Sequence, residues 1–320
     1  MPRGGKGAPV VSQRLAELDD RQLRRRLRGP GLTLHLPPSV ARLHSDVPRV
    51  ARDLLRLYGD FTLGRDDEFA DFHLAVHYDR GLHALWRRLA GRRQARFSTD
   101  GLAAFTTLPA TQAFHMVEWG LNWAVTAHAH HYVVYHAAVL ERDGRALVLP
   151  APPGSGKSTL TAALAQRGWR LLSDELALLD SRDGRLYGLA RPVNLKNQAI
   201  ALMRDFAPDA VLTEPVPDTL KGTLSLMKAP GDAIARVRDG ARPAWVVVPS
   251  FEPGAEATLE PLPKAQAHLL LAEQAFNYDI HGADGFEATA DLVDGAGCWA
   301  FTYSRLDDAI GVFDALAAEP

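Results

Sequence analysis

The chain has 320 residues, of which 47% are hydrophobic and 23% charged, and its formal net charge is −2. This balance is typical of a globular protein of one or two domains, and it gives no global charge that would attract nucleic acid or an anionic membrane, so we expect neither partner. Cys298 is the only cysteine, and no stretch approaches the roughly 20 apolar residues that span a bilayer, so we expect a reduced, cytoplasmic protein.

The first part of the chain is predicted to hold two segments. Residues 1–30 form a basic N-terminal segment in which Arg21–Arg28 carries five arginines. Such a run can bind phosphate or nucleic acid, but it is more often the solvated face of a helix. Over residues 31–130 the pattern is mixed, because alternation predicts a strand at Phe72–Tyr78 and Leu82–Leu89 has helical character. We therefore expect a separate N-terminal α+β module over residues 31–130.

Residues 131–320 are predicted to form an α/β domain. Strands are expected at His131–Leu140, Arg145–Leu149, Trp169–Leu172, Leu176–Leu179 and Trp245–Pro249. Pro208–Pro217 is rich in proline and is expected to be an exposed loop, and Lys264–Pro320 is expected to be mostly helical.

The string APPGSGKST at Ala151–Thr159 lies between a predicted strand and a predicted helix that begins at Lys157. It has the pattern of a P-loop, in which backbone N–H groups wrap phosphates and a lysine reaches the β and γ oxygens. Ala151 replaces the usual first glycine, and Pro152 and Pro153 have no N–H group. The nucleotide-binding residues are therefore expected to be Gly154, Ser155, Gly156, Lys157, Ser158 and Thr159.

Phosphoryl transfer also requires a metal and a group that accepts a proton. Asp174 and Glu175 follow an apolar strand that is expected to lie beside the P-loop strand. One carboxylate could then reach Mg²⁺ together with the Ser158 hydroxyl, and the other could act as the base. Without a P-loop, the same pair would be an ordinary polar strand end.

Other polar residues gave weaker indications. His136, one strand upstream, could tune a catalytic carboxylate or donate to phosphate. With His128, His130 and His131 it invites a zinc site, but no spacing brings three of these histidines together. Basic residues beyond the acids could clamp phosphate or an acidic substrate, although solvated surface is an equal alternative; they are Arg191, Lys196 and Lys221.

Three segments together resemble the catalytic domain of HPr serine kinase/phosphorylase, whose fold is similar to the nucleotide site of phosphoenolpyruvate carboxykinase. They are His136–Leu140, the P-loop, and RGWRLLSDE at Arg167–Glu175. A looser resemblance, to HPr-kinase-related proteins of uncharacterised or peptide-tailoring systems, rests on RPVNLKN at Arg191–Asn197, KGTLS at Lys221–Ser225 and AFNYDIHGADGF at Ala275–Phe286.

The resemblance implies ATP and Mg²⁺ as cofactors and a homo-oligomer as one state of assembly. It implies that Lys157 binds the β and γ phosphates, that Ser158 and Glu175 hold Mg²⁺, and that Asp174 is the general base, supported by His136. The segment after the acids reads GLARPVNLKNQ and lacks the glycine-rich signature of the phosphorylase reaction. Neither that reaction nor HPr as the substrate is therefore implied.

The leading hypothesis is an ATP-dependent kinase that phosphorylates a serine or threonine of a protein or peptide. A small-molecule P-loop kinase is the enzymatic alternative, although about 150 residues precede the P-loop here, whereas such kinases commonly begin with it. The other alternative is a nucleotide-dependent binding or regulatory module that transfers no phosphate.

Overall fold

The computed structural model describes residues 13–103, 106–152 and 154–319. The chain divides into two compact units, Met1–Val117 and Glu118–Pro320, which we call the N-terminal and C-terminal units. The sequence placed this boundary at residues 130/131. The two boundaries differ by residues 118–130, which include most of helix α4 (Ala113–His128). These residues belong to the C-terminal unit because Glu118 and Asn122 contact side chains of that unit. The functional division into a basic segment, a module and a catalytic domain stays a prediction, and residues 1–12 of that segment lie outside the described residues.

The N-terminal unit is a mixed α/β structure built on one six-stranded sheet with the order β1-β2-β3-β4-β5, in which β6 also pairs with β4. Alternation in β3 buries Phe72, Leu74 and Val76 on one face, as the sequence predicted. Helices α1 and α2 pack against each other and against β2. The elements before α4 are η1 (Leu15–Glu17), α1 (Asp20–Arg28), β1 (Leu32–Leu36), β2 (Ser39–Ser45), α2 (Pro48–Tyr58), β3 (Phe72–Tyr78), α3 (Leu82–Leu89), β4 (Gln94–Thr99), β5 (Leu102–Ala103), β6 (Leu108–Pro109) and η2 (Ala110–Gln112).

The C-terminal unit is mixed α/β with three sheets. The largest has the order β10-β8-β9-β16-β18-β17, and two three-stranded sheets have the orders β12-β11-β7 and β13-β15-β14. Its elements after α4 are β7 (Val133–Tyr135), β8 (Ala137–Arg142), β9 (Arg145–Pro150), α5 (Lys157–Ala165), β10 (Arg170–Ser173), β11 (Ala177–Asp180), β12 (Arg185–Tyr187), β13 (Val193–Lys196), α6 (Gln198–Phe206), β14 (Val216–Thr219), β15 (Gly222–Met227), α7 (Gly231–Ala235), β16 (Arg242–Phe251), β17 (Thr258–Pro261), α8 (Lys264–Glu273), α9 (Tyr278–Asp294), β18 (Gly297–Tyr303) and α10 (Leu306–Ala318).

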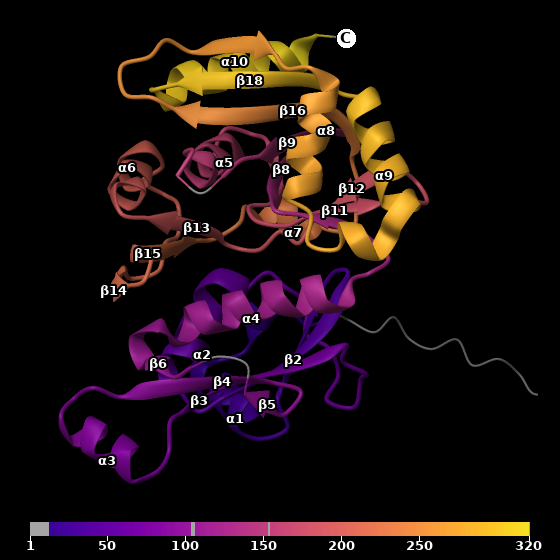
Figure 1. Cartoon of the computed structure of the whole chain (residues 1–320). Coiled ribbons are helices and arrows are strands. Elements are labelled where there is room, and N and C mark those ends of the chain that lie inside the picture. The colour runs from indigo at the N-terminus through magenta and orange to yellow at the C-terminus, as the bar shows by residue number, and fades with distance from the viewer. Residues whose placement is uncertain (1–12, 104–105, 153, 320) are drawn as a thin grey trace, which may run out of the picture. The chain divides into compact units, whose positions relative to one another are not determined.

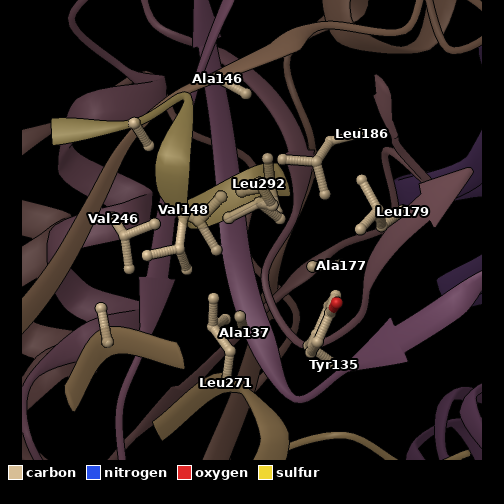
Figure 2. Packing of buried hydrophobic residues seen from close by; sticks show 14 of the residues in the cluster. Tyr135, Ala137, Ala146, Val148, Ala177, Leu179, Leu186, Val246, Leu271 and Leu292 are labelled. Atoms are coloured by element: carbon tan, nitrogen blue, oxygen red, sulfur yellow. The ribbon is translucent and has the colours of Figure 1, made fainter. Parts of the chain in front are cut away.

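The large sheet of the C-terminal unit is covered by helices on both faces (Figure 1). On one face, α8 and α9 contribute Leu271 and Leu292 to a buried cluster with Val148 and Val246 (Figure 2). On the opposite face, α10 packs Phe313 against Phe301, with ring centroids 4.9 Å apart, and α5 contacts α10. Burial on both faces explains why the central strands β9 and β16 contain the apolar runs Ala146–Leu149 and Ala244–Val248.

One sequence expectation about the elements of this unit was wrong, and two others were confirmed over most of their length. The strand expected at His131–Leu140 is two strands, because the chain changes sheets at His136: β7 pairs with β11, and β8 pairs with β9 and β10. The expected loop Pro208–Pro217 enters strand β14 at Val216. The segment expected to be mostly helical also contains β18, which is held by parallel pairing with the distant β16.

In the described part of the chain, no helix combines the length and the apolar character that crossing a membrane requires.

Candidate functional site

The glycine-rich loop lies at the carboxyl edge of the large sheet. Strand β9 leads into it, and β9, β16 and β18 are parallel, so their carboxyl ends meet at one edge. The loop is fixed there by two hydrogen bonds: the Phe251 N–H donates to the Ser155 carbonyl at 3.1 Å, and the Tyr303 hydroxyl donates to the Gly156 carbonyl at 3.2 Å. This edge is where ligands commonly bind in α/β sheets.

The two described glycines of the loop both need a left-handed backbone. Gly154 has φ +97° and Gly156 has φ +85°. At Gly156 a Cβ atom would also lie 2.5 Å from the Tyr303 hydroxyl oxygen, whereas at Gly154 it would meet nothing within 4 Å. Gly156 caps α5 without a side-chain hydrogen bond, so N–H groups of the first turn remain available to an anion. Pro153 lies outside the described residues.

Lys157 begins helix α5, as the sequence predicted, and its side chain is buried, with 7% of the residue exposed. Its ammonium group donates a hydrogen bond to the backbone carbonyl of Asp174 at 2.9 Å. Burial lowers the pKa of Lys157, and the carboxylates of Asp174 and Glu175 partly oppose this effect. The structure therefore places the loop lysine against the backbone of Asp174. The expectation that the strand before the acids lies beside the P-loop strand was wrong, because β8 lies between β10 and β9.

Asp174 and Glu175 follow strand β10 but occupy different positions. Asp174 is 4% exposed, and its Oδ2 accepts a hydrogen bond from the Asn194 N–H at 3.1 Å. Its Oδ1 accepts no hydrogen bond of ordinary geometry from any described residue. Burial raises the pKa of Asp174, and Lys157 opposes this rise. Glu175 is less buried, and its Oε2 accepts a hydrogen bond from the side-chain amide of Asn122.

A pocket of ≈ 540 Å³ opens in front of the loop. It is lined by His136, Pro152, Gly154, Ser155, Gly156, Lys157, Ser158, Thr159, Glu175, Asn194, Lys196, Ala199 and Lys221. Three buried polar atoms at or directly behind this wall have no hydrogen-bond partner among the described residues: Ser155 Oγ, Asp174 Oδ1 and Asn194 Oδ1. Unsatisfied buried polar groups are costly, so a group that enters the pocket and binds these atoms would be stabilised there.

His136 lines the pocket at the point where the chain changes sheets. Burial lowers the pKa of His136, Lys157 lowers it further, and Glu175 opposes both. The imidazole ring lies 6.1 Å from the ring of Phe276, centroid to centroid. Since Glu175 is the acid that acts on His136, the expected support of Asp174 by this histidine stays a prediction.

The three basic residues singled out from the sequence lie in two places. Lys196 and Lys221 line the pocket, and neither forms an ion pair with a described residue. Arg191 lies outside the pocket and is 8% exposed. Its guanidinium is directed to Asn122 and Glu118 in a small cavity of ≈ 20 Å³ beside the acids.

Two residues of the site were missed by sequence reasoning. Asn194 lines the pocket and binds Asp174, and it lies two residues before Lys196 on strand β13. Side chains two apart on a strand share a face, so this spacing could have revealed Asn194. Asn122 comes from helix α4, far from the motif in sequence, and no local pattern marks it.

The oxygen atoms at the site suit Mg²⁺. The Ser158 hydroxyl and the Glu175 carboxylate are in the pocket wall, and the unpartnered Asp174 Oδ1 lies behind them. Among the residues described, no group of three or more His, Cys, Asp or Glu side chains could hold a metal ion alone. Mg²⁺ is commonly bound by one or two carboxylates together with water and substrate phosphates.

Comparisons with known proteins add a weak structural similarity and no match in sequence. No family model matches the chain, and no curated protein matches it in sequence. Among solved structures it is similar to the Hpr(Ser) kinase/phosphatase from Coxiella burnetii, with 12% identity over 58% of this chain and 99% of that chain, and a TM-score of 0.27. This likeness is weak, so the resemblance seen in the sequence motifs stays a prediction.

Proposed function

We propose that this protein is an ATP-dependent phosphotransferase that moves the γ-phosphate to a hydroxyl group, and that the acceptor is a serine or threonine of a protein or peptide in the cytoplasm. The observation that carries the proposal is one pocket that combines a glycine-rich loop, a buried lysine, a helix N-terminus and the Glu175 carboxylate, with the Asp174 carboxyl group buried behind its wall. Phosphoryl transfer depends mostly on positioning and charge stabilisation, and these groups supply both.

The triphosphate is proposed to bind over the loop. The unpaired N–H groups at the start of α5 would bind phosphate oxygens, and Lys157 would turn from the Asp174 carbonyl to the β and γ phosphates. Burial lowers the pKa of Lys157 because it destabilises the charged ammonium form. A bound phosphate would stabilise that form again, since it places negative charge beside the ammonium group.

The metal is assigned to Ser158 and Glu175, with Asp174 behind them. When bound, Mg²⁺ would neutralise charge on the β and γ phosphates. Glu175 suits this role because its carboxylate is already held in one orientation by Asn122.

Asp174 is proposed to receive the proton of the acceptor hydroxyl. Its Oδ1 accepts no hydrogen bond of ordinary geometry from a described residue, and burial raises its pKa above the ordinary value, so the carboxyl group binds a proton more readily than an exposed aspartate. Asp174 lies one layer behind the pocket wall, and contacts of catalytic bases are often long before substrates bind.

Binding is tested first. Calorimetric titration with the ATP analogue AMPPNP and Mg²⁺ should show binding to the unaltered protein and to Lys264→Ala, which removes an exposed lysine, but not to Lys157→Met. Transfer is then tested with γ-labelled ATP and lysate of the source cell, with Lys157→Met as the blank. Binding without any specific label would contradict phosphoryl transfer and support the nucleotide-dependent regulatory alternative; labelling of a metabolite alone would support the small-molecule kinase.

Two variants separate the roles of the acids. Asp174→Asn should keep AMPPNP binding and lose transfer, and Glu175→Gln should weaken the metal dependence of binding. If Asp174→Asn transferred phosphate at the full rate, the assignment of the base would be wrong.

A further inference from the structure

A chain of polar side chains, of which Glu118 and Arg191 are buried and Asn122 is half-buried, runs behind Glu175 and is not part of the pocket wall. Asn122 donates a side-chain hydrogen bond to Glu175 and accepts one from the guanidinium of Arg191. Arg191 also donates to the Glu118 backbone carbonyl at 3.5 Å and lies 3.9 Å from the Glu118 carboxylate. We propose that Asn122, oriented by Arg191, is a positioning residue that fixes the Glu175 carboxylate for metal binding. This inference rests on the proposed function.

The orientation of the Asn122 amide follows from the chemistry of its neighbours. A guanidinium has only donors and an ionised carboxylate has only acceptors. The amide oxygen must therefore face Arg191 and the amide nitrogen must face Glu175. An amide is the group that can link such a pair without adding charge, so Asn122 couples the position of Glu175 to a buried cation.

Arg191 is itself held in place by the backbone. The N–H groups of Leu189 and Ala190 both donate to the Leu172 carbonyl at 2.8 Å, and Ala190 has φ +46°, in the left-handed region that non-glycine residues rarely adopt. The segment before Arg191 is thus fastened to the strand that leads to the acids. Glu118 supplies a nearby opposite charge, so Arg191 is compensated without contacting Glu175 directly.

The hydrogen bond from Asn122 occupies only one of the two carboxylate oxygens of Glu175. Asn122 engages Oε2, and among the described residues no hydrogen bond is made to Oε1, while the side chain lines the pocket. The cavity beside this chain of contacts has a volume of only ≈ 20 Å³, which leaves room for no ligand larger than a water molecule. The polar chain therefore acts on the pocket through Glu175 and is not a second binding site.

The test measures metal affinity and not turnover. Mn²⁺ is titrated, by electron paramagnetic resonance, into the protein saturated with AMPPNP. Asn122→Leu and the nearly isosteric Asn122→Asp, which cannot donate to Glu175, should each weaken Mn²⁺ binding about tenfold, the lower end of the effect expected for residues that orient metal ligands. Arg191→Met should weaken it less. Thr126→Val, one turn further along the same helix, removes a hydroxyl that donates to the Trp123 carbonyl and should leave it unchanged.

A double-mutant cycle separates positioning from a general structural role. In the Glu175→Gln background, Asn122→Leu should no longer change the Mn²⁺ affinity, because the carboxylate that it positions is gone. AMPPNP binding measured in EDTA should be equal in wild type and Asn122→Leu. Equal Mn²⁺ affinity of wild type and Asn122→Asp, or an undiminished effect of Asn122→Leu in the Glu175→Gln background, would overturn the inference. Failure of the wild type to bind AMPPNP would instead overturn the proposed function.

Discussion

Two clusters of buried opposite charges in the C-terminal unit use similar groups in different ways. Around Arg170, the guanidinium donates to Glu141 and to the backbone carbonyls of Arg236 and Asp239, both at 3.0 Å. Around Lys157, the ammonium donates to one backbone carbonyl, and Asp174 Oδ1 accepts no hydrogen bond of ordinary geometry from a described residue.

The carboxyl groups of the two clusters respond in opposite directions. Burial alone would raise the pKa of Glu141, but Arg170 and the Gly144 N–H outweigh burial and hold that pKa below its ordinary value. Burial also raises the pKa of Asp174, and there Lys157 does not overcome it. We call the cluster around Arg170 closed, because its guanidinium and the Glu141 carboxylate are paired with each other. It stabilises the fold. We call the cluster around Lys157 open, because Asp174 Oδ1 accepts no hydrogen bond of ordinary geometry from a described residue.

The largest expected effect comes from breaking the closed cluster. Arg170→Met leaves the Glu141 carboxylate buried without its main partner, so the free energy of unfolding should fall by about 3–5 kcal/mol. Urea unfolding measures this. Arg305→Met removes an exposed pair with Asp308 and should cost less than about 1 kcal/mol. A loss for Arg170→Met as small as that of the control would show that the two clusters do not differ in this way.

Removing the Lys157 charge from the open cluster should weaken nucleotide binding and leave the free energy of unfolding nearly unchanged. Lys157→Met should weaken AMPPNP binding at least about 100-fold, because the loss of a buried charge partner costs about 2–5 kcal/mol. The free energy of unfolding should change by no more than about 1 kcal/mol, since burial already disfavours the charged lysine. Calorimetry and urea unfolding measure the two effects. Unfolding comparable to that of Arg170→Met would contradict the contrast.

Substitutions of Gly154 and Gly156 test how strongly the backbone of the loop is constrained. Gly156→Ala adds a Cβ 2.5 Å from the Tyr303 hydroxyl oxygen at a positive φ, so it should lower the free energy of unfolding by about 2 kcal/mol and reduce AMPPNP affinity. Gly154→Ala has the same backbone cost without the clash, and about 1 kcal/mol is expected. Tyr303→Phe should partly restore Gly156→Ala; if it does not, the close contact with the hydroxyl is not the cause.

The smallest expected effect is a difference in pH dependence. Asp174 has a pKa raised above 3.8, so the stability that its protonated form contributes is present below pH 3.8 and is lost as pH rises through the raised pKa. Asp174→Asn should therefore gain stability relative to wild type as pH rises from about 4, by about 1.4 kcal/mol for each unit of pKa shift.

Glu141 has a pKa lowered below 4.5, so its contribution is present above pH 4.5 and is lost as pH falls through the lowered pKa. Glu141→Gln should therefore be less stable than wild type at neutral pH, and the deficit should shrink in acid. Unfolding free energies of both variants and wild type between pH 3 and 7 check the two signs. Parallel pH profiles for the two variants would remove the distinction between the clusters.

Local patterns were sufficient where a segment's structure depends on its own residues. The strand at Phe72–Tyr78 and the helix at Leu82–Leu89 were confirmed at the expected bounds, and α5 begins at Lys157 as expected. Their signals are alternation, periodicity and glycine placement, which need no distant partner. Strand β18 was missed because its pairing with β16 joins segments separated by about fifty residues, and such pairing leaves no local signal.

The sequence by itself determined the loop backbone, because Gly154 and Gly156 adopt the positive φ that glycine favours and α5 begins at Lys157 wherever the loop lies. Only the tertiary structure decided what surrounds the loop. The change of sheets brings His136 to the pocket, β13 brings the Asn194 N–H to Asp174, and α4 brings Asn122 to Glu175. It also placed Arg191 behind the acids and not in the pocket. The physical reason is that contacts between distant segments are fixed by packing, and the spacing of residues along the chain carries no record of them.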